Sequence, residues 1–305
     1  MAPLAEALAH PAAAEDVANW RLAAPAKLNL WLTVVGQRAD GFHELDSLLA
    51  LLELADELSI EPGGTGLRID GPAAAGVPGD LTNLAWRGWA AGLAGRSHAG
   101  TVLVHKRIPA AAGLGGGSSD AAAAWRLARW VTGQGDDPPT ADDLVALSAI
   151  GADIPFFATR LALARVRGIG ERVDLGGRAE AAGPPGSPGP PAEVVLVHPP
   201  FGLRTGAVFA ELRRDEWSGP VTGAELAPGH NDLEAAARRL RPELNDVFRL
   251  MAGAGGAPHL TGSGPTIFAL TDDPERADGI GARLRRAGLT TTRTRLRPEP
   301  ASIER

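Results

Sequence analysis

Residues 113–125 read GLGGGSSDAAAAW, and this stretch decides the fold. It follows a predicted strand at 101–108, TVLVHKRI, which we expect Pro109 to end, and it leads into a strongly helix-forming run, AAAAWRLARWV. A strand, a glycine loop and a helix in this order point backbone N–H groups and the helix dipole at an anion. The glycines of the loop permit positive φ angles and a close approach of the backbone to a ligand. The stretch therefore predicts a phosphate-binding loop anchored to a rigid helix, with a plain hinge as the alternative.

Two familiar phosphate loops do not match this stretch. A Walker A loop requires a lysine directly after its last glycine, and no lysine follows these glycines. A dinucleotide-binding fingerprint requires a glycine at the position of Ser118. The loop must therefore belong to another class of phosphate site, if it is one.

The composition sets wider bounds. The 305 residues allow roughly two domains of about 150 residues. A net charge of −6 argues against a nucleic acid or an anionic membrane as partner, and the absence of cysteine excludes disulfides, thiolate metal sites and cysteine nucleophiles. The first residues lack the basic region of a signal peptide, and no apolar run approaches the ~20 residues of a membrane span, so we expect a cytoplasmic protein. Of the 30 basic residues only Lys27 and Lys106 are lysine, which makes both candidates for positions that require an ammonium group, with chance as the alternative.

Strands and helices alternate along the chain, which predicts an α+β or α/β protein in two halves. From Ala26 the apolar residues alternate with period two, so Lys27 and Asn29 share the face of a strand away from its leucines. The stretch GDLTNLAWRGWAAGLAG, near residue 80, is predicted to be helical with Asp80 or Thr82 as its candidate N-cap, and another helix is predicted over about 232–252. The run at 177–192 is too rich in proline and glycine for regular structure. Further helices are predicted in ADDLVALSAIG and PERADGIGARLRRAG, and further strands in EVVLVHP and TTTRTRLR.

Four separated motifs, in order, resemble those of the GHMP kinases. They are PAKLNLWLTVVGQRADGFHEL, PAAAGLGGGSSDAAAA, LSAIGADIPFF and LTGSGPTIFAL, which span about residues 20–290. The resemblance implies a two-domain α+β fold, with a ribosomal S5 domain 2-like amino-terminal domain, a ferredoxin-like carboxy-terminal domain and the active site in the cleft between them. It divides the chain into an extension at 1–19, an ATP-binding domain at 20–163 and a second domain at 164–305.

The amino-terminal motif resembles one branch of this family. That branch transfers the γ-phosphoryl group of ATP to the 2-hydroxyl of a cytidine diphosphate-linked methylerythritol, in the non-mevalonate route to isoprenoid precursors. By resemblance Asp153 is the base that accepts the hydroxyl proton, and Lys27 lies beside it as its counter-charge. Taken singly, Asp153 could equally be a helix or turn cap and Lys27 a solvated surface residue.

The resemblance also assigns the binding residues. The ATP residues are Asn83, Lys106, Pro109, Ala110, Ala111, Ala112, Gly113, Leu114, Gly115, Gly116, Gly117, Ser118 and Ser119. The cytidine substrate residues are Asn29, Phe42, His43, Thr205 and Phe209, with the two phenylalanines sandwiching the base. A third glycine motif, Thr261, Gly262, Ser263 and Gly264, closes over the phosphates or supports the first loop. Core packing is the alternative for the phenylalanines, a surface turn for His43 and an exposed strand position for Lys106, and HND at 230–232 receives no catalytic role.

Two features depart from the family pattern. Ala110, Ala111 and Ala112 stand where relatives often have glycine, and the chain has no tyrosine, so Phe42 replaces one. Magnesium is expected with ATP, with Ser118 as a candidate ligand and no secure set of protein ligands. The alternatives are a homoserine or mevalonate-type kinase, a diphosphomevalonate decarboxylase, or a non-catalytic nucleotide- or RNA-binding module. We expect a small-molecule substrate and a monomer or weak homodimer.

Overall fold

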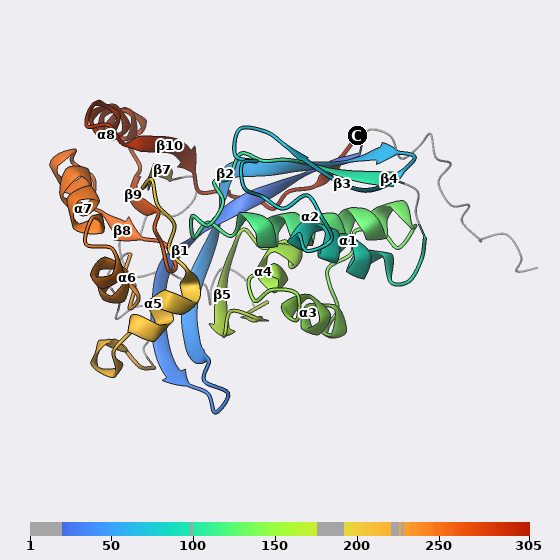
Figure 1. Cartoon of the computed structure of the whole chain (residues 1–305), viewed down its shortest axis with the longest axis horizontal. Coiled ribbons are helices and arrows are strands. Elements are labelled where there is room, and N and C mark those ends of the chain that lie inside the picture. Colours follow the sequence, from blue (N-terminus) through green and yellow to red (C-terminus); the bar gives the residue numbers. More distant parts are fainter. Residues whose placement is uncertain (1–19, 98–99, 176–191, 221–225, 227–228) are drawn as a thin grey trace, which may run out of the picture.

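The computed structural model describes residues 20–97, 100–175, 192–220, 226 and 229–305. The predicted extension at 1–19 and nearly all of the predicted loop at 177–192 lie outside the described residues. The chain forms two halves, each built on its own β-sheet, with a long hairpin running between them (Figure 1). The α+β class is therefore confirmed.

The larger sheet is built around that hairpin. Its strands β1 (Arg21–Gln37) and β2 (His43–Pro62) pair antiparallel along most of their length, with three register shifts. The strand order is β11-β1-β2-β4-β3, and β5 and β6 extend from β2. The remaining strands are β3 (Thr65–Asp70), β4 (Gly100–His105), β5 (Leu163–Gly168), β6 (Arg172–Val173) and β11 (Ile303–Glu304).

Helices α1 (Leu84–Leu93) and α2 (Gly116–Val131) lie together against this sheet (Figure 1). Small residues allow the two helices to touch backbone to backbone. A Cβ at Gly88 would lie 2.1 Å from the Ala121 carbonyl oxygen, and one at Gly92 would lie 2.4 Å from that of Trp125. The alanine run that predicted α2 thus also sets how closely it packs. Two shorter helices follow, α3 (Ala141–Ser148) and α4 (Ile154–Ala158).

The second half has a four-stranded antiparallel sheet in the order β10-β7-β9-β8. In chain order these strands are the fourth, first, third and second of this half, which is the ferredoxin-like arrangement and confirms that prediction. The strands are β7 (Glu193–His198), β8 (His259–Leu260), β9 (Ile267–Thr271) and β10 (Thr290–Arg295). The helices are α5 (Thr205–Glu211), the 3-10 helix η1 (Arg214–Glu216), α6 (Glu234–Leu240), α7 (Leu244–Gly253) and α8 (Pro274–Arg286).

The predicted limits of three elements were wrong. The N-cap of α1 is Asn83, whose side chain accepts from the Ala85 amide at 2.8 Å, because Asp80 instead binds Thr82. The predicted helix over 232–252 is two helices, since Pro242 interrupts it. The strand predicted at 101–108 ends at His105, because the carboxylate of Asp56 takes the amides that follow, at positions 107 and 108.

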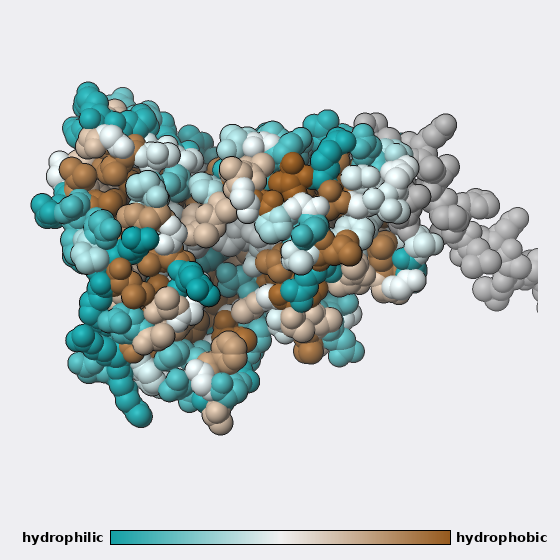
Figure 2. Space-filling view, viewed as in Figure 1, coloured by the Kyte–Doolittle hydropathy of each residue, from teal (hydrophilic) through white to brown (hydrophobic). Residues whose placement is uncertain are grey.

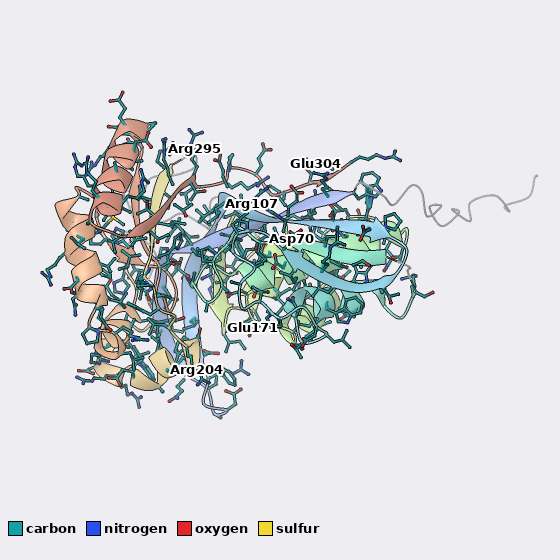
Figure 3. The ribbon with its side chains drawn as sticks, turned by 45° about the horizontal axis from the view of Figure 1, so that its top comes forward. Asp70, Arg107, Glu171, Arg204, Arg295 and Glu304 are labelled. Carbon is teal, nitrogen blue, oxygen red and sulfur yellow. The ribbon has the colours of Figure 1, made fainter. Side chains whose placement is uncertain are left out.

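The chain crosses between the halves more than once. Strand β5 begins at the predicted boundary near residue 163 and pairs with β2 in the larger sheet. After β10 the chain returns to add β11 to β1, and Arg295 and Glu304 mark the two ends of this return (Figure 3). The division of the chain at 163/164 stays a prediction. None of the described helices combines the length and apolar character that a membrane crossing needs.

Candidate active site

A cleft of about 680 Å³ lies between the two halves. The space-filling view shows the surface hollowed there (Figure 2). One wall is formed by β1, β2, the glycine loop and the start of α4, and the other by α5 and the third glycine motif. The predicted residues that line it are Lys27, Asn29, Asn83, Lys106, the whole stretch 109–118, Asp153, Thr205, Phe209, Gly262 and Ser263.

The glycine loop is held from two sides. The Lys27 amide donates to the Leu114 carbonyl at 2.9 Å, which ties the loop to β1. Gly115, with φ of 71°, is the N-cap of α2, so the first amides of this helix open into the cleft. Gly113 packs against the third glycine motif, where a Cβ would lie 2.8 Å from the Thr261 carbonyl oxygen. The two glycine motifs therefore support each other directly.

The alanines of this loop differ from one another. Among the described residues Ala111 is one of three non-glycine residues with positive φ, at 52°, whereas Ala110 and Ala112 are not in this group. The departure from glycine thus places a side chain in the left-handed region at one position of the three.

Lys27 is buried on β1, and its Nζ donates to Asn29 Oδ1 at 2.6 Å. The expectation that these two residues lie on a polar face away from the core is wrong in one respect, because both faces of β1 are covered here. Burial lowers the pKa of Lys27, and the nearby carboxylate of Asp153 opposes that effect. The ammonium group therefore depends on the few polar partners that surround it.

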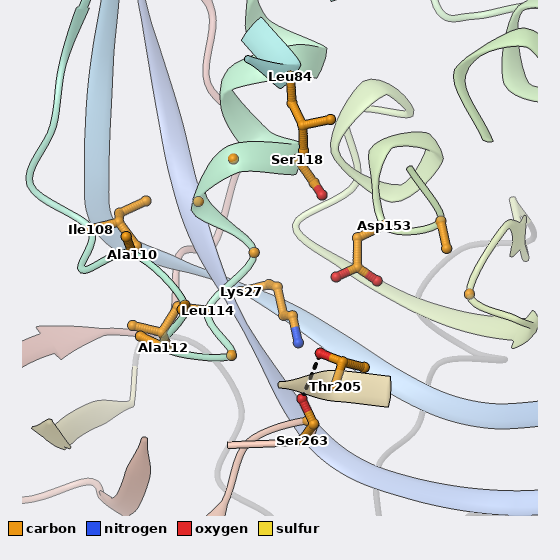
Figure 4. A pocket seen from close by; sticks show the side chains of 18 of the residues that line it. Lys27, Leu84, Ile108, Ala110, Ala112, Leu114, Ser118, Asp153, Thr205 and Ser263 are labelled. Carbon is orange, nitrogen blue, oxygen red and sulfur yellow. Dashed lines mark hydrogen bonds between the residues drawn. The ribbon is translucent and has the colours of Figure 1, made fainter. Parts of the chain in front are cut away.

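Asp153 is the N-cap residue of α4, but its side chain makes no capping hydrogen bond. The carboxylate points into the cleft, opposite the ammonium of Lys27 (Figure 4). The turn between β5 and β6 also lines the cleft and lies close to this carboxylate, since a Cβ at Gly170 would lie 3.5 Å from Asp153 Oδ1. The structure thus leaves the carboxylate available to accept a proton from a bound molecule.

Lys106 is buried next to the glycine loop, in a cluster with Asp56 and Asp120. Its Nζ donates to Asp120 Oδ2 at 2.6 Å and to a carboxylate oxygen of Asp56. Burial opposes the charged form of Lys106, but the two carboxylates outweigh it and raise its pKa. Burial raises the pKa of Asp120 to about 8, and its Oδ1 has no hydrogen-bond partner among the described residues. A contact of Lys106 with the adenosine part of ATP stays a prediction, as it does for Asn83.

Three of the predicted residues that bind nucleotide or form the third motif lie behind the walls of the cleft. Ser119 is buried within α2, and its hydroxyl has no hydrogen-bond partner among the described residues. Within the third motif, Thr261 and Gly264 are buried and do not line the cleft. Ser263 reaches the cleft and meets Thr205 through their hydroxyl oxygens, 3.0 Å apart (Figure 4).

The residues predicted for the cytidine end separate into two groups. The ring of His43 stacks on that of Phe209, and the indole of Trp217 meets His43 edge-on with centroids 5.3 Å apart. Burial lowers the pKa of His43. Phe42 is 59% exposed in the turn between β1 and β2, and it takes no part in this aromatic cluster. The structure therefore brings His43 and Phe209 together and leaves Phe42 outside.

Several residues that sequence reasoning missed hold the site together. Asn231 donates to the carbonyl oxygens of Leu260 and Gly262 at 2.9 and 2.8 Å, so it supports the third glycine motif. Asp232 accepts from the Val34 amide at 2.7 Å, which anchors the same segment to β1. The signal that could have found them is the HND triplet itself. Asp120 lies within the glycine-loop motif itself, whereas Ser47 and Trp217 lie outside all four motifs.

The described residues contain no group of three or more His, Cys, Asp or Glu side chains that could hold a metal ion. Mg²⁺ in phosphoryl-transfer sites is bound by few protein groups, carboxylates or Ser/Thr hydroxyls, together with the phosphates and water. A single hydroxyl such as that of Ser118, which lines the cleft, is therefore compatible with a magnesium ion carried by a nucleotide.

Comparison with known proteins agrees with this architecture. Residues 83–159 match the model of the GHMP kinases N terminal domain, and residues 220–289 match that of the GHMP kinases C terminal domain. The chain is 38% identical over 275 residues to a 4-diphosphocytidyl-2-C-methyl-D-erythritol kinase from Dinoroseobacter shibae, which covers 86% of this chain and 88% of the relative. It is 37% identical over 304 residues to a protein of the same name from Nocardia farcinica, which covers 92% of this chain and 94% of the relative.

Solved structures show the same pattern. A crystal structure of 4-(cytidine 5'-diphospho)-2C-methyl-D-erythritol kinase is similar with a TM-score of 0.71 and 33% identity, over 90% of this chain and 98% of that one. A homoserine kinase from Cytophaga hutchinsonii is similar with a TM-score of 0.59 and 16% identity, over 93% and 96% of the two chains, which shows a shared fold alone.

Proposed function

The chain belongs to the 4-diphosphocytidyl-2-C-methyl-D-erythritol kinases, within the GHMP kinases, and from this membership we propose how its cleft works. It is an ATP-dependent kinase, and its reaction transfers the γ-phosphoryl group of ATP to the 2-hydroxyl of 4-diphosphocytidyl-2-C-methyl-D-erythritol. That reaction is a step in the non-mevalonate route to isoprenoid precursors. The observation that carries the proposal is that Lys27, Asp153 and the glycine loop face one cleft.

In this proposal Asp153 is the base. The substrate hydroxyl oxygen attacks the γ-phosphorus, its proton passes to the Asp153 carboxylate, and the bond from the γ-phosphorus to the bridging oxygen of ADP breaks. The availability of this carboxylate, which makes no capping bond in α4, supports the role. Lys27 balances negative charge between the carboxylate and the phosphates, a role that the Coulombic effect of Asp153 on its pKa supports. Phosphoryl transfer depends mainly on such positioning and on charge stabilisation.

The ATP phosphates are assigned to the loop at 109–118. Free amides at the start of α2 and the positive end of its dipole favour an anion at this place. Magnesium bound with ATP would offset phosphate charge, and Ser118 is the proposed protein contact. Asn83 and Lys106 are assigned to the adenosine end, where both line the cleft.

The cytidine end is assigned to His43, Phe209 and Thr205, with Asn29 facing the substrate near the reacting group. Aromatic side chains stack on any base, and His43 adds a hydrogen-bonding edge that can distinguish cytosine. Phe209 lines the cleft and stacks on His43, which supports this assignment. A small-molecule substrate, no nucleic acid or membrane partner, a cytoplasmic location and a monomer or weak homodimer belong to the same proposal.

The test is ATP-dependent phosphorylation of 4-diphosphocytidyl-2-C-methyl-D-erythritol, followed by mass spectrometry, with homoserine and mevalonate as rival substrates. We expect a mass gain of one phosphoryl group on the cytidine compound alone. If homoserine or mevalonate is phosphorylated instead, the protein is still a kinase of this fold, but the assignment of His43 and Phe209 to cytidine is wrong. No turnover of any of the three would contradict the proposed function.

A further inference from the structure

A buried serine on β2 lies behind the lysine of the cleft. Ser47 is 1% exposed, and its Oγ lies 2.5 Å from the Trp31 carbonyl oxygen and 2.8 Å from Asn29 Nδ2. A hydroxyl has one hydrogen to donate. Because a carbonyl oxygen can only accept, that hydrogen goes to Trp31, and the serine oxygen must accept from Asn29.

This arrangement determines which way the Asn29 amide faces. Its NH₂ group has to point to Ser47, so its carbonyl oxygen Oδ1 points to the other side. On that side it accepts from Lys27 Nζ at 2.6 Å. The opposite orientation would place two donors, an amide NH₂ and an ammonium, against each other. The serine hydroxyl therefore selects the orientation that suits a charged lysine.

Asn29 also joins the lysine to the third glycine motif. Its backbone N–H donates to Thr261 Oγ1 at 3.2 Å, and Thr261 Oγ1 lies 3.4 Å from Asn29 Oδ1. A Cβ added at Gly262 would lie 3.2 Å from both Lys27 Nζ and Asn29 Oδ1. The ammonium group is thus held where β1 meets the third motif.

We propose that Ser47 is a positioning residue, whose hydroxyl orients the Asn29 amide and thereby holds the Lys27 ammonium in place. Ser47 lines the cleft, but its only hydrogen is donated to Trp31 and its oxygen accepts from Asn29, so it has no hydrogen left for a substrate and acts through Asn29. The catalytic consequence rests on the proposed function, whereas the effect on Lys27 does not.

The surroundings of Lys27 contain few charges that could mask this effect. Asp153, at the start of α4, is the charged group that acts on it. The other elements around it present the hydroxyl groups of Ser47 on β2 and Thr261 in the third motif, and the backbone of Leu114 and Gly115 in the glycine loop. Because burial already disfavours the ammonium, the loss of one acceptor should be measurable.

The chain allows a direct measurement, since its sequence contains two lysines. Lysine labelled with ¹³C at Cε gives two NMR signals, which a Lys106→Arg variant assigns. In Ser47→Ala we expect the pKa of Lys27 to fall by roughly one unit, the size expected for losing a hydrogen bond to a charged group. Ser59→Ala is the matched control, because Ser59 lies on the same strand and lines a pocket away from the cleft. An unchanged Lys27 pKa in Ser47→Ala, or an equal fall in Ser59→Ala, would overturn the proposal.

A second background tests the route through Asn29. In Asn29→Asp both side-chain oxygens accept, so the orientation no longer matters, and Ser47→Ala should leave the Lys27 pKa of that variant nearly unchanged. A fall as large as in the parent would show that Ser47 acts by another route and would overturn the proposal. If Ser47→Ala does not fold, Ser47→Cys retains the size with a weaker donor, and the same comparison applies.

Kinetics separate positioning from binding. In Ser47→Ala we expect kcat to fall about 10-fold with both KM values within about twofold, and Ser47→Thr to restore most of the loss. The alkaline limb of the kcat profile should move to lower pH, because a lower Lys27 pKa means that the ammonium loses its proton earlier. A rise in KM with kcat unchanged would contradict a positioning role. If the Lys27 pKa falls in Ser47→Ala as expected but the wild-type protein does not phosphorylate the cytidine compound, the proposed function is contradicted and the positioning role of Ser47 is not.

Discussion

The ring of His43, at the start of β2, stacks on the ring of Phe209 in α5, with centroids 5.2 Å apart and planes inclined by 21°. The two residues come from the two halves of the molecule, so this pair joins the halves beside the cleft, which Phe209 lines. A cytosine that stacks here has to part the rings or cover one of them. Stacking on an aromatic ring contributes about 1–3 kcal/mol per base.

We therefore expect Phe209→Ala to raise the KM for the cytidine substrate roughly 10-fold, with the KM for ATP unchanged, as measured by steady-state kinetics. Phe42→Ala is the matched control, because Phe42 adjoins His43 in the sequence but is exposed and lies outside the aromatic cluster. An equal effect of the two variants would show that the ring in α5 has no special part in binding the base.

The role of Asp153 predicts a loss of rate rather than of binding. In Asp153→Asn the carboxylate that accepts the proton is replaced by an amide, and we expect kcat to fall about 10²- to 10⁴-fold, the range of general-base catalysis. The fold should be retained, because the side chain makes no capping bond. The KM values should change little, because the carboxylate acts by accepting the proton during the transfer. Asp142→Asn, in the exposed first turn of α3, controls for the charge change. Retention of more than about a tenth of the wild-type kcat would remove Asp153 from the role of base.

The positive φ of Ala111 predicts an effect on stability. A non-glycine residue in the left-handed region costs about 1–2 kcal/mol, and glycine costs roughly 0.5–1 kcal/mol in unfolded-chain entropy. Ala111→Gly should therefore leave the Tm unchanged or raise it slightly. Ala110→Gly incurs the entropy cost without the relief, so it should lower the Tm in the same calorimetric experiment. A lower Tm for Ala111→Gly than for Ala110→Gly would contradict the backbone conformation of the loop.

The buried cluster of Lys106 predicts a pH dependence of stability. Burial raises the pKa of Asp120 from an ordinary value of 3.8 to about 8, so the folded state holds a proton that the unfolded chain releases. The resulting stability is complete below about pH 4 and is lost as the pH rises towards 8. Asp120→Asn removes this dependence, and its Tm should fall less than that of the wild type between pH 5 and pH 8.

Histidines with lowered pKa values, such as His198 at about 4 owing to burial, favour the opposite trend. They are present in both proteins, so the difference between the two Tm profiles isolates Asp120. Parallel profiles for wild type and Asp120→Asn would show that this carboxyl group is ionised across the whole range.

Local physics made much of the site readable in the sequence. Glycines that need positive φ, an alanine-rich helix behind them and a strand in front predict the phosphate loop without any distant contact. The period-two pattern after Ala26 likewise places Lys27 and Asn29 on one face of one strand. The ferredoxin-like half was predicted from the resemblance of four ordered motifs to those of the GHMP kinases, and no single residue indicates it.

What only the tertiary structure decided is which distant residues share a buried environment. Asp56 and Asp120 reach Lys106 from different elements, and Ser47 meets Asn29 where β1 and β2 pair with a register shift between Asn29 and Trp31. His43 and Phe209 face each other across the halves while the neighbouring Phe42 points to solvent. A sequence determines local conformation, because backbone preferences act between near neighbours. Burial and ion pairing act through space, so the pKa values and partners of these side chains exist only once elements distant in the sequence have packed around them.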